Sequence, residues 1–313
     1  MRICVFGVGG VGGYFGGRLA EAGNSVAFIA RGATLDVLRK EGLRVESPLG
    51  DISLPDVEAS DDPAEVGEVD AVILGVKAWQ VPGVAEVARP MIGASTVIVP
   101  LQNGVEAADQ LVSLYGPEHV IGGMCRIVSF VVGPGRIRHQ GVEPFVAIGE
   151  LDNSRSERVE RIAAAFVDAG VDTKISPDIQ SSLWQKLLFI APVSGLGAVT
   201  RVPVGDLRSN EETYSLLRQA MLEVEALATA RGVALADDAI DKTLKFVDGL
   251  EGNMTSSMQR DIMDGRPSEL EALNGVVVRL GREAGVATPV HGFIYAALAP
   301  MEARTRRLAS DTD

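Results

Sequence analysis

The first thirty-one residues constrain the fold more than any other stretch of this chain. An apolar run over residues 3–6 is short enough for a buried strand, and a second apolar run covers residues 26–29. Between them the residues follow helical spacing and stop at Gly23-Asn24. Three glycines in the pattern G-x-G-x-x-G come directly after the first run: Gly7, Gly9 and Gly12. Strand, glycine turn, helix and strand in this order predict the first βαβ unit of a dinucleotide-binding fold.

Each glycine of this motif has a separate physical role in binding a dinucleotide. Gly7 permits the tight turn, Gly9 lets backbone N–H groups approach a pyrophosphate, and Gly12 allows the helix and strand to pack closely. The helix N-terminus, at Gly10 and Val11, offers unpaired N–H groups and the positive end of the helix dipole to the same pyrophosphate. A glycine-rich turn without a ligand is the alternative, because 35 glycines in 313 residues produce chance matches. The position of the motif between two strands favours a cofactor site.

The end of the second strand indicates which dinucleotide is bound. NAD-binding proteins usually place an acidic residue there to accept a hydrogen bond from the ribose 2′-hydroxyl. This chain has Ala30-Arg31-Gly32 instead, and its next carboxylate is Asp36. The guanidinium of Arg31 suits a 2′-phosphate, because its fork of donors matches phosphate oxygens. The alternative is a solvated arginine at the strand end. NADP(H) is therefore expected rather than NAD(H).

Composition excludes several classes of partner. The 313 residues are 46% hydrophobic, which is enough for two domains with sizeable cores. The formal net charge is −13, which argues against nucleic acid or an anionic membrane as a partner. The first apolar run is already the first strand rather than part of a leader, and no membrane-spanning segment is expected. We therefore expect a cytoplasmic protein.

Neither cysteine nor histidine shows a metal-binding or redox motif. Cys4 and Cys125 lie in apolar surroundings and are expected to be buried thiols rather than a disulfide. His119, His139 and His291 are scattered without metal-ligand spacing, so no metal site is expected.

Strands alternate with helices up to about residue 176, which predicts a Rossmann-type doubly wound sheet over residues 1–176. Further strands are expected at residues 71–76, 96–101, 120–127 and 171–175, a hairpin at 43–54, and antiparallel strands within 133–149. Helices are expected at residues 34–40, 81–88, 104–114 and 155–169. The fold class is α/β.

After Ser176-Pro177 the periodicity becomes helical, so residues 177–313 are expected to form an all-α C-terminal domain. Apolar or amphipathic stretches cover residues 179–196, 211–230, 237–247, 254–263 and 292–304. Ser268 is expected to start another helix with Glu271 in a capping box, and Gly285 to end it.

Two strand ends of the first domain carry polar residues where ligands bind in open α/β sheets. Lys77 follows an expected strand, where a cation near a helix start opposes the dipole. Asn103 follows the next strand, although Asn103-Gly104 is also a common turn pair. The alternative for Lys77 is a solvated helix N-terminus, and the alternative for Asn103 is an ordinary turn. We expect the two side chains near the nicotinamide and a substrate.

The second domain contains one unusual charge. Lys186 is the only charged residue between Leu183 and Thr200. Such a lysine either extends its ammonium group to solvent or is retained as a proton donor. Glu269 is a candidate carboxylate partner, and the hydroxyls of Ser256-Ser257 suit a substrate carboxylate.

These residues together resemble one known family over nearly the whole chain. The features that carry the resemblance are the N-terminal glycine motif, Arg31, Lys77-Ala78-Trp79-Gln80, Asn103-Gly104, Trp184-x-Lys186 and Ser256-Ser257-Met258 with Glu269. In this order they resemble the ketopantoate reductase (2-dehydropantoate 2-reductase) family. The resemblance implies NADPH-dependent reduction of the ketone of 2-dehydropantoate to D-pantoate, on the route to pantothenate and coenzyme A. It also implies a Rossmann domain followed by a helical domain, and leaves a homodimer open.

The resemblance also implies roles for individual residues. Lys186 matches the catalytic lysine that protonates the ketone oxygen as hydride arrives at C2, and Glu269 matches the acid that works with it. Ser257 matches a serine that contacts the substrate carboxylate. Asn103 matches the asparagine beside nicotinamide and substrate. Arg31 and Lys77 match cofactor-side residues.

One departure concerns the substrate. The family pattern has asparagines four and eight residues after the lysine, where they hydrogen-bond the substrate, and this chain has Ile190 and Ser194. Ser194 remains a candidate substrate-binding residue, whereas Ile190 makes the site more apolar. Pro192 also falls within this helix and is expected to bend it.

Three functions remain open from the sequence. The first is reduction of 2-dehydropantoate. The second keeps the fold and hydride chemistry but acts on a different, more apolar 2-keto acid, because of Ile190 and Ser194. The third is a non-catalytic NADP-sensing protein, against which the presence of both Lys186 and Glu269 argues.

Overall fold

The computed structural model describes residues 1–310 and forms two compact units. The first unit contains residues 1–102 and 106–182, and the second contains residues 103–105 together with the chain from Leu183 onward. The boundary between the units falls within the helix Ile179–Thr200. The short segment Asn103–Val105 also belongs to the second unit. The domain boundary expected at residues 176–177 stays a prediction.

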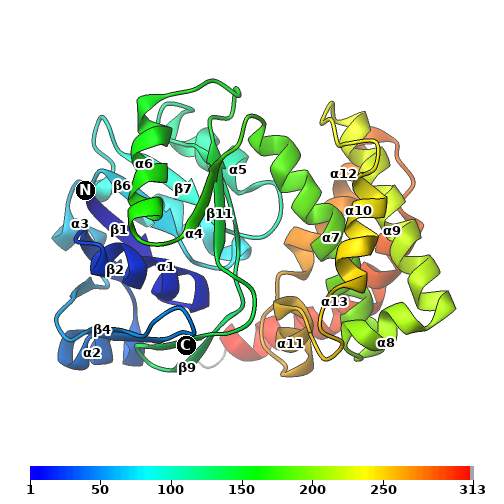
Figure 1. Cartoon of the computed structure of the whole chain (residues 1–313), viewed down its shortest axis with the longest axis horizontal. Coiled ribbons are helices and arrows are strands. Elements are labelled where there is room, and N and C mark those ends of the chain that lie inside the picture. Colours follow the sequence, from blue (N-terminus) through cyan, green and yellow to red (C-terminus); the bar gives the residue numbers. More distant parts are fainter. Residues whose placement is uncertain (311–313) are drawn as a thin grey trace. The chain divides into compact units, whose positions relative to one another are not determined.

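A parallel five-stranded sheet is the centre of the first unit (Figure 1). Its strand order is β5-β2-β1-β6-β7, with bounds Glu58–Ser60, Ser25–Ile29, Arg2–Phe6, Ala71–Leu74 and Val97–Pro100. Side chains of β1 alternate between two hydrophobic cores: Ile3 and Val5 face one, Cys4 and Phe6 the other. A strand with two apolar faces must be covered on both sides, so this sheet is doubly wound as predicted.

Helices connect the parallel strands and cover both faces of the sheet. They are α1 (Gly10–Glu21), α2 (Gly32–Glu41), α3 (Pro63–Val66), α4 (Val81–Val87), α5 (Ala107–Tyr115) and the short turns η1 (Ala78–Gln80) and η2 (Arg89–Met91). Residues of α1 share a core with Ile3 and Val5, whereas residues of α4 and α5 share the core on the other face. Neither α3 nor β5 was predicted, because α3 is only four residues long and β5 is three residues long without a large apolar residue.

Two smaller sheets extend the first unit. The first has the order β4-β3-β10-β9, with bounds Ile52–Leu54, Leu43–Glu46, Arg136–His139 and Ser129–Gly133. The second has the order β12-β11-β8, with bounds Asp172–Ile175, Phe145–Gly149 and Gly122–Arg126, and helix α6 (Glu157–Asp168) precedes β12. The predicted hairpin at 43–54 is confirmed as β3–β4.

The strand pairing expected for residues 120–127 and 133–149 differs from the pairing in these sheets. Residues 120–127 were expected to continue the parallel sheet, but Val120 makes a single bridge to Ile98 and β8 pairs with β11. Within residues 133–149, the turn at Pro134-Gly135 joins β9 to β10, whereas β11 pairs with β8 instead of with β10. Strand partners far apart in the chain depend on tertiary packing, which local patterns do not specify.

Helix α1 lies between the parallel sheet and the β4-β3-β10-β9 sheet, and glycines line both of its faces. A Cβ at Gly13 would lie 2.6 Å from Cγ1 of Ile137 in β10, and a Cβ at Gly16 would lie 2.6 Å from the ring of Phe28 in β2. The helix can therefore approach both sheets only because these positions have no side chain.

The second unit is all-α, as predicted (Figure 1). Its elements are α7 (Ile179–Thr200, from Leu183), α8 (Val204–Ser209), α9 (Glu211–Ala230), α10 (Ala239–Asp248), α11 (Ser257–Met263), the π-helix η3 (Glu271–Gly275), α12 (Val276–Ala284) and α13 (Pro289–Ser310). Gly285 ends α12 in a left-handed conformation with φ 68°, as expected for a helix C-cap.

Helix α7 is apolar along nearly its whole length. Within the described residues it is the helix long and apolar enough to span a membrane by composition, yet 67% of its apolar window is buried inside the protein. That burial is what a core helix shows.

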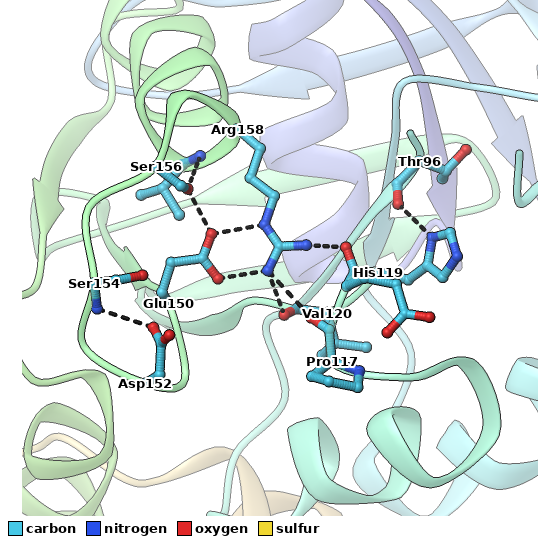
Figure 2. A network of polar contacts seen from close by, with 11 residues as sticks. Thr96, Pro117, His119, Val120, Glu150, Asp152, Ser154, Ser156 and Arg158 are labelled. Carbon is cyan, nitrogen blue, oxygen red and sulfur yellow. Dashed lines mark hydrogen bonds and ion pairs between the residues drawn. The ribbon is translucent and has the colours of Figure 1, made fainter. Parts of the chain in front are cut away.

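A partly buried ion pair between Arg158 of α6 and Glu150, the residue after β11, also anchors the loop before β8 (Figure 2). Arg158 donates to Glu150 through Nε at 2.6 Å and Nη2 at 2.5 Å, and Ser156 Oγ donates to the same carboxylate at 2.5 Å. The guanidinium also donates to the backbone carbonyls of Pro117, Glu118 and Val120. Burial raises the pKa of Glu150, but the hydrogen bonds from Arg158 and Ser156 outweigh it, so the pKa lies below its usual value.

We predict that Arg158→Met lowers the free energy of unfolding by about 3 kcal/mol, because it leaves the Glu150 carboxylate buried without its partner. Chemical denaturation monitored by circular dichroism measures this change. The matched control is Arg155→Met, which removes a pair with Glu160 whose side chains are 80% and 54% exposed and should cost less than about 1 kcal/mol.

The same pair has a defined pH dependence. Because the folded-state pKa of Glu150 is depressed, its stabilisation is present above the unfolded-state pKa and is lost as pH falls through the folded-state value. The difference in stability between wild type and Arg158→Met should therefore shrink on acidification. A difference that stays constant down to acid unfolding contradicts the assignment.

Candidate active site

The glycine loop of the first unit leads into a helix N-terminus with unpaired N–H groups. Gly7 adopts φ +94° and donates to the Ile29 carbonyl at 3.0 Å, which makes the turn from β1. The first hydrogen bond of α1 runs from the Gly13 N–H to the Gly9 carbonyl at 2.8 Å. The N–H groups of Gly10 and Val11 therefore have no intrahelical acceptor, and the first turn contains no acidic residue. This arrangement fits a pyrophosphate.

Gly12 is needed for a different contact. It lies so close to the end of β6 that a Cβ on Gly75 would be 2.6 Å from the Gly12 Cα. The two glycines bring the start of α1 against the carboxyl end of β6, where Lys77 follows. The structure thus places the glycine motif and Lys77 at the same edge of the sheet.

Arg31 lies at the N-cap of α2 in extended conformation and is exposed. The first turn of α2 has no acidic residue, so its unpaired N–H groups and the guanidinium offer positive charge together. A phosphate group fits this donor set, whereas a ribose hydroxyl would find no carboxylate acceptor in that turn.

Lys77 is half-buried at the end of β6, and its surroundings explain the Lys77-Ala78-Trp79-Gln80 stretch. The Lys77 N–H donates to Oε1 of Gln80 at 3.0 Å, and the Gln80 N–H donates to the Lys77 carbonyl at 2.9 Å. The glutamine thus closes the turn in which the lysine lies. Gln102, which no sequence pattern indicated, donates to the carbonyls of Leu74 and Val76 at 2.8 and 3.1 Å.

Asn103 belongs to the second unit, and the structure brings it to Glu269. Its Nδ2 donates to Oε2 of Glu269 at 2.8 Å, although the two residues are 166 positions apart. Glu269 is 5% exposed. Gly104 has φ +97°, and a Cβ there would lie 2.8 Å from the Ala272 carbonyl. Residues 103–105 therefore pack against the start of the helix that follows Glu269.

The capping box expected at Ser268 and Glu271 is wrong. The N–H of Ser268 donates to the Glu302 carboxylate at 3.0 Å, and the Ser268 hydroxyl donates to it at 2.6 Å. Glu271 instead accepts from the Tyr295 hydroxyl at 2.7 Å. A glutamate of α13 thus replaces the local one, because Glu302 packs onto this turn in the folded chain. Arg306 pairs with Glu302 at 2.7 Å and donates to the Ser268 carbonyl at 2.9 Å.

The π-helix η3 turns Asn274 toward α7. Its Nδ2 donates to the Ala191 carbonyl at 3.1 Å and lies 3.0 Å from Nδ1 of His291, whose Nε2 lies 3.2 Å from the Ala220 carbonyl. Burial lowers the pKa of His291 to about 4, so the ring is neutral at pH 7, with Nε2 as donor and Nδ1 as acceptor. The sequence contained no local signal for this network, because its members come from four helices.

Lys186 and Ser257 lie on two helices that pack together. Lys186 is half-buried on α7, and further along α7 a Cβ at Gly197 would lie 2.6 Å from Oε1 of Gln259 in α11. Ser257 is the first residue of α11, and the N-cap Ser256 accepts from the Gln259 N–H at 3.1 Å. Ser194 of α7 is 0% exposed, and its hydroxyl has no hydrogen-bond partner in the described residues. Its expected contact with substrate stays a prediction.

Other clusters serve the fold. Within residues 1–310 no three metal-ligating side chains gather. Both cysteines are buried free thiols, as predicted. Ser47 lies 2.9 Å from Nδ1 of His139, but its hydroxyl also accepts from the Leu49 N–H and from Arg18. That hydroxyl closes the β3–β4 turn.

Comparison with known proteins identifies the family. The model "Ketopantoate reductase PanE/ApbA" matches residues 3–153, and the model of the C terminal part of the same family matches residues 178–302. The chain belongs to the ketopantoate reductase family. The predicted resemblance, the fold class and the assignment as an oxidoreductase that uses a nicotinamide cofactor are thereby confirmed.

Individual relatives span nearly the whole chain. A protein named 2-dehydropantoate 2-reductase from Mesorhizobium japonicum is 33% identical, and the match covers 92% of this chain and 94% of that protein. "Uncharacterized oxidoreductase YkpB" of Bacillus subtilis is 32% identical over 97% of this chain and 99% of its own. A crystal structure of a PanE/ApbA family ketopantoate reductase from Ralstonia eutropha is 32% identical, with a TM-score of 0.90 over 98% of this chain and all of its own. D-mandelate dehydrogenase in a structure with NADH has the same fold, with a TM-score of 0.90 at 22% identity.

We predict that Glu302→Leu lowers the stability of the second unit by about 2–4 kcal/mol, because the buried N–H and hydroxyl of Ser268 lose their acceptor. Thermal unfolding and amide exchange of Ser268 and Leu270 measure the effect. The control Glu283→Leu removes a pair with Arg279 on a half-exposed helix face and should change stability by less than about 1 kcal/mol. Equal effects of the two variants would contradict the role of Glu302.

Proposed function

We propose that the protein reduces the keto group of a 2-keto acid with NADPH, and that 2-dehydropantoate, giving D-pantoate for pantothenate and coenzyme A synthesis, is the first substrate to test. The observation that supports it most directly is the Asn103–Glu269 hydrogen bond at 2.8 Å, formed in the same helical unit as Lys186. Surface carboxylates that aid solubility are exposed, whereas Glu269 is 5% exposed and oriented by an amide. Such a carboxylate is suited to a catalytic role.

The residues of the second unit are assigned the following roles. NADPH, when bound, supplies the hydride that adds to C2 of the keto acid. Lys186 holds the proton that goes to the ketone oxygen, so that the carbonyl becomes a hydroxyl and negative charge on that oxygen is stabilised. Glu269 keeps the lysine oriented, and Asn103 holds Glu269 in place. Ser257 donates to the substrate carboxylate.

The first unit is assigned the cofactor. Gly7, Gly9 and Gly12 shape the turn, and the N–H groups of Gly10 and Val11 bind the pyrophosphate. Arg31 binds the 2′-phosphate, which makes NADPH the preferred cofactor, and Lys77 lies on the nicotinamide side. Two buried free thiols suit a reducing compartment, so we place the protein in the cytoplasm.

Arg31→Ala should raise the Kd for NADPH by about 10- to 100-fold, the value of a charge-assisted hydrogen bond, and change the Kd for NADH less than about twofold. Nucleotide fluorescence titration measures both constants. Arg39→Ala, an exposed arginine of the same helix, is the control and should leave both unchanged. Equal losses for the two nucleotides count against the 2′-phosphate contact.

Lys186→Ala should lower kcat for 2-dehydropantoate by about 10²- to 10⁴-fold without changing the Kd for NADPH, because general acid catalysis supplies that range. Lys242→Ala, whose side chain is 70% exposed on another helix of this unit, is the control. Turnover within about tenfold of wild type excludes Lys186 as the acid. Tight NADPH binding by the wild type without turnover of any 2-keto acid would indicate a sensor instead.

A further inference from the structure

We infer that the site takes 2-keto acids whose substituent beyond the keto group is apolar and carries no hydrogen-bonding group. The inference rests on the proposed function and names the substrate class of that same site. It comes from the surroundings of Lys186 in the second unit, where the keto group would be protonated.

Beyond Lys186, helix α7 offers a substrate almost no polar side chain. Between Lys186 and Thr200, Ser194 is the only residue with a polar side chain. Ser194 is 0% exposed, and its hydroxyl is enclosed without a partner in the described residues. A substrate whose keto oxygen lies at the Lys186 ammonium therefore meets apolar side chains from this helix.

Phe189 and Ile190 are the side chains nearest to Lys186 on the next helical turn. Residues three and four positions apart are neighbours on a helix surface, so the two flank the lysine on either side. Both are half-buried and so retain surface for contact. Phe189 packs edge-to-face on Phe246 of α10, with ring centroids 5.1 Å apart, and Phe246 is 41% exposed. An aromatic side chain, fixed by Phe246, and a branched aliphatic side chain thus border the proton donor.

Neighbouring polar groups are already engaged in holding the helices together. Gln185 Nε2 donates to the Thr243 hydroxyl at 3.0 Å, and that hydroxyl donates to the Ala239 carbonyl at 2.7 Å. Gln259 Nε2 donates to the Val202 carbonyl at 2.9 Å. Gln185, Thr243 and Gln259 thus hold α7, α10 and α11 in place. Ser257 is assigned to the substrate carboxylate. A hydroxyl on the far end of the substrate would have to give up water without a side-chain partner from α7.

The test uses two substrates that differ by that hydroxyl alone. Trimethylpyruvate has the carbon skeleton of 2-dehydropantoate without its terminal hydroxyl. A site built to bind the hydroxyl rejects the analogue lacking it by about 10⁴- to 10⁵-fold, whereas an apolar site gains from its absence. NADPH oxidation by the wild-type protein should give a kcat/KM for trimethylpyruvate about tenfold above that for 2-dehydropantoate.

Ile190→Asn tests the residue responsible. It should shift the ratio of the two kcat/KM values at least about tenfold toward 2-dehydropantoate, because the amide supplies the missing partner. Leu222→Asn, the same kind of change at a leucine that is 44% exposed on α9, is the control and should leave the ratio unchanged. Phe189→Leu keeps the site apolar and should preserve the preference for trimethylpyruvate. It therefore distinguishes an effect of the polar side chain in Ile190→Asn from a general disturbance of α7 by substitution.

The outcomes distinguish this inference from the proposed function. A wild-type ratio at or below one, or an Ile190→Asn ratio equal to wild type, overturns the apolar substrate class while reduction of 2-keto acids still stands. Absence of NADPH oxidation with both acids overturns the proposed function and this inference together.

Discussion

The close packing of helix α1 between two sheets is the constraint on which the first unit depends. Without side chains at Gly13 and Gly16, the helix approaches β10 on one face and β2 on the other. Its first turn thereby lies against the carboxyl end of β6, with N–H groups free of intrahelical acceptors. The same glycines therefore set the architecture and leave a site for the pyrophosphate, so a substitution that repacks α1 would alter both.

In the second unit, the corresponding constraint is the burial of the Glu269 carboxylate. A carboxylate that is 5% exposed needs fixed donors, and Asn103 supplies one of them. Ser268 is held in turn by Glu302 and Arg306 of α13. The turn that carries Glu269 is thus secured from a helix that ends the described chain, which connects the stability of α13 to the geometry of the proposed acid–base pair.

Local patterns predicted the elements well where one physical signal dominated. The buried strands β1, β2, β6 and β7, the hairpin at 43–54 and helix α9 follow apolar runs, turn residues and helical spacing. Prediction was wrong where a distant group replaced a local one: Glu302 took the place of Glu271 at Ser268, and β8 became the partner of β11. Both results depend on which surfaces meet after folding, and no local pattern contains that information.

By itself the sequence determined the dinucleotide-binding βαβ unit, the helical character of the C-terminal part, and the family to which the chain belongs, because each depends on residue spacing or on an ordered set of motifs. Only the tertiary structure decided that Asn103 meets Glu269 and that Asn274 joins His291 to α7. It also decided that the Ser194 hydroxyl is enclosed while Phe189 and Ile190 stay half-buried beside Lys186. The reason is physical: spacing along a chain specifies which face of a helix a residue occupies, whereas burial and hydrogen-bond partners depend on what packs against that face.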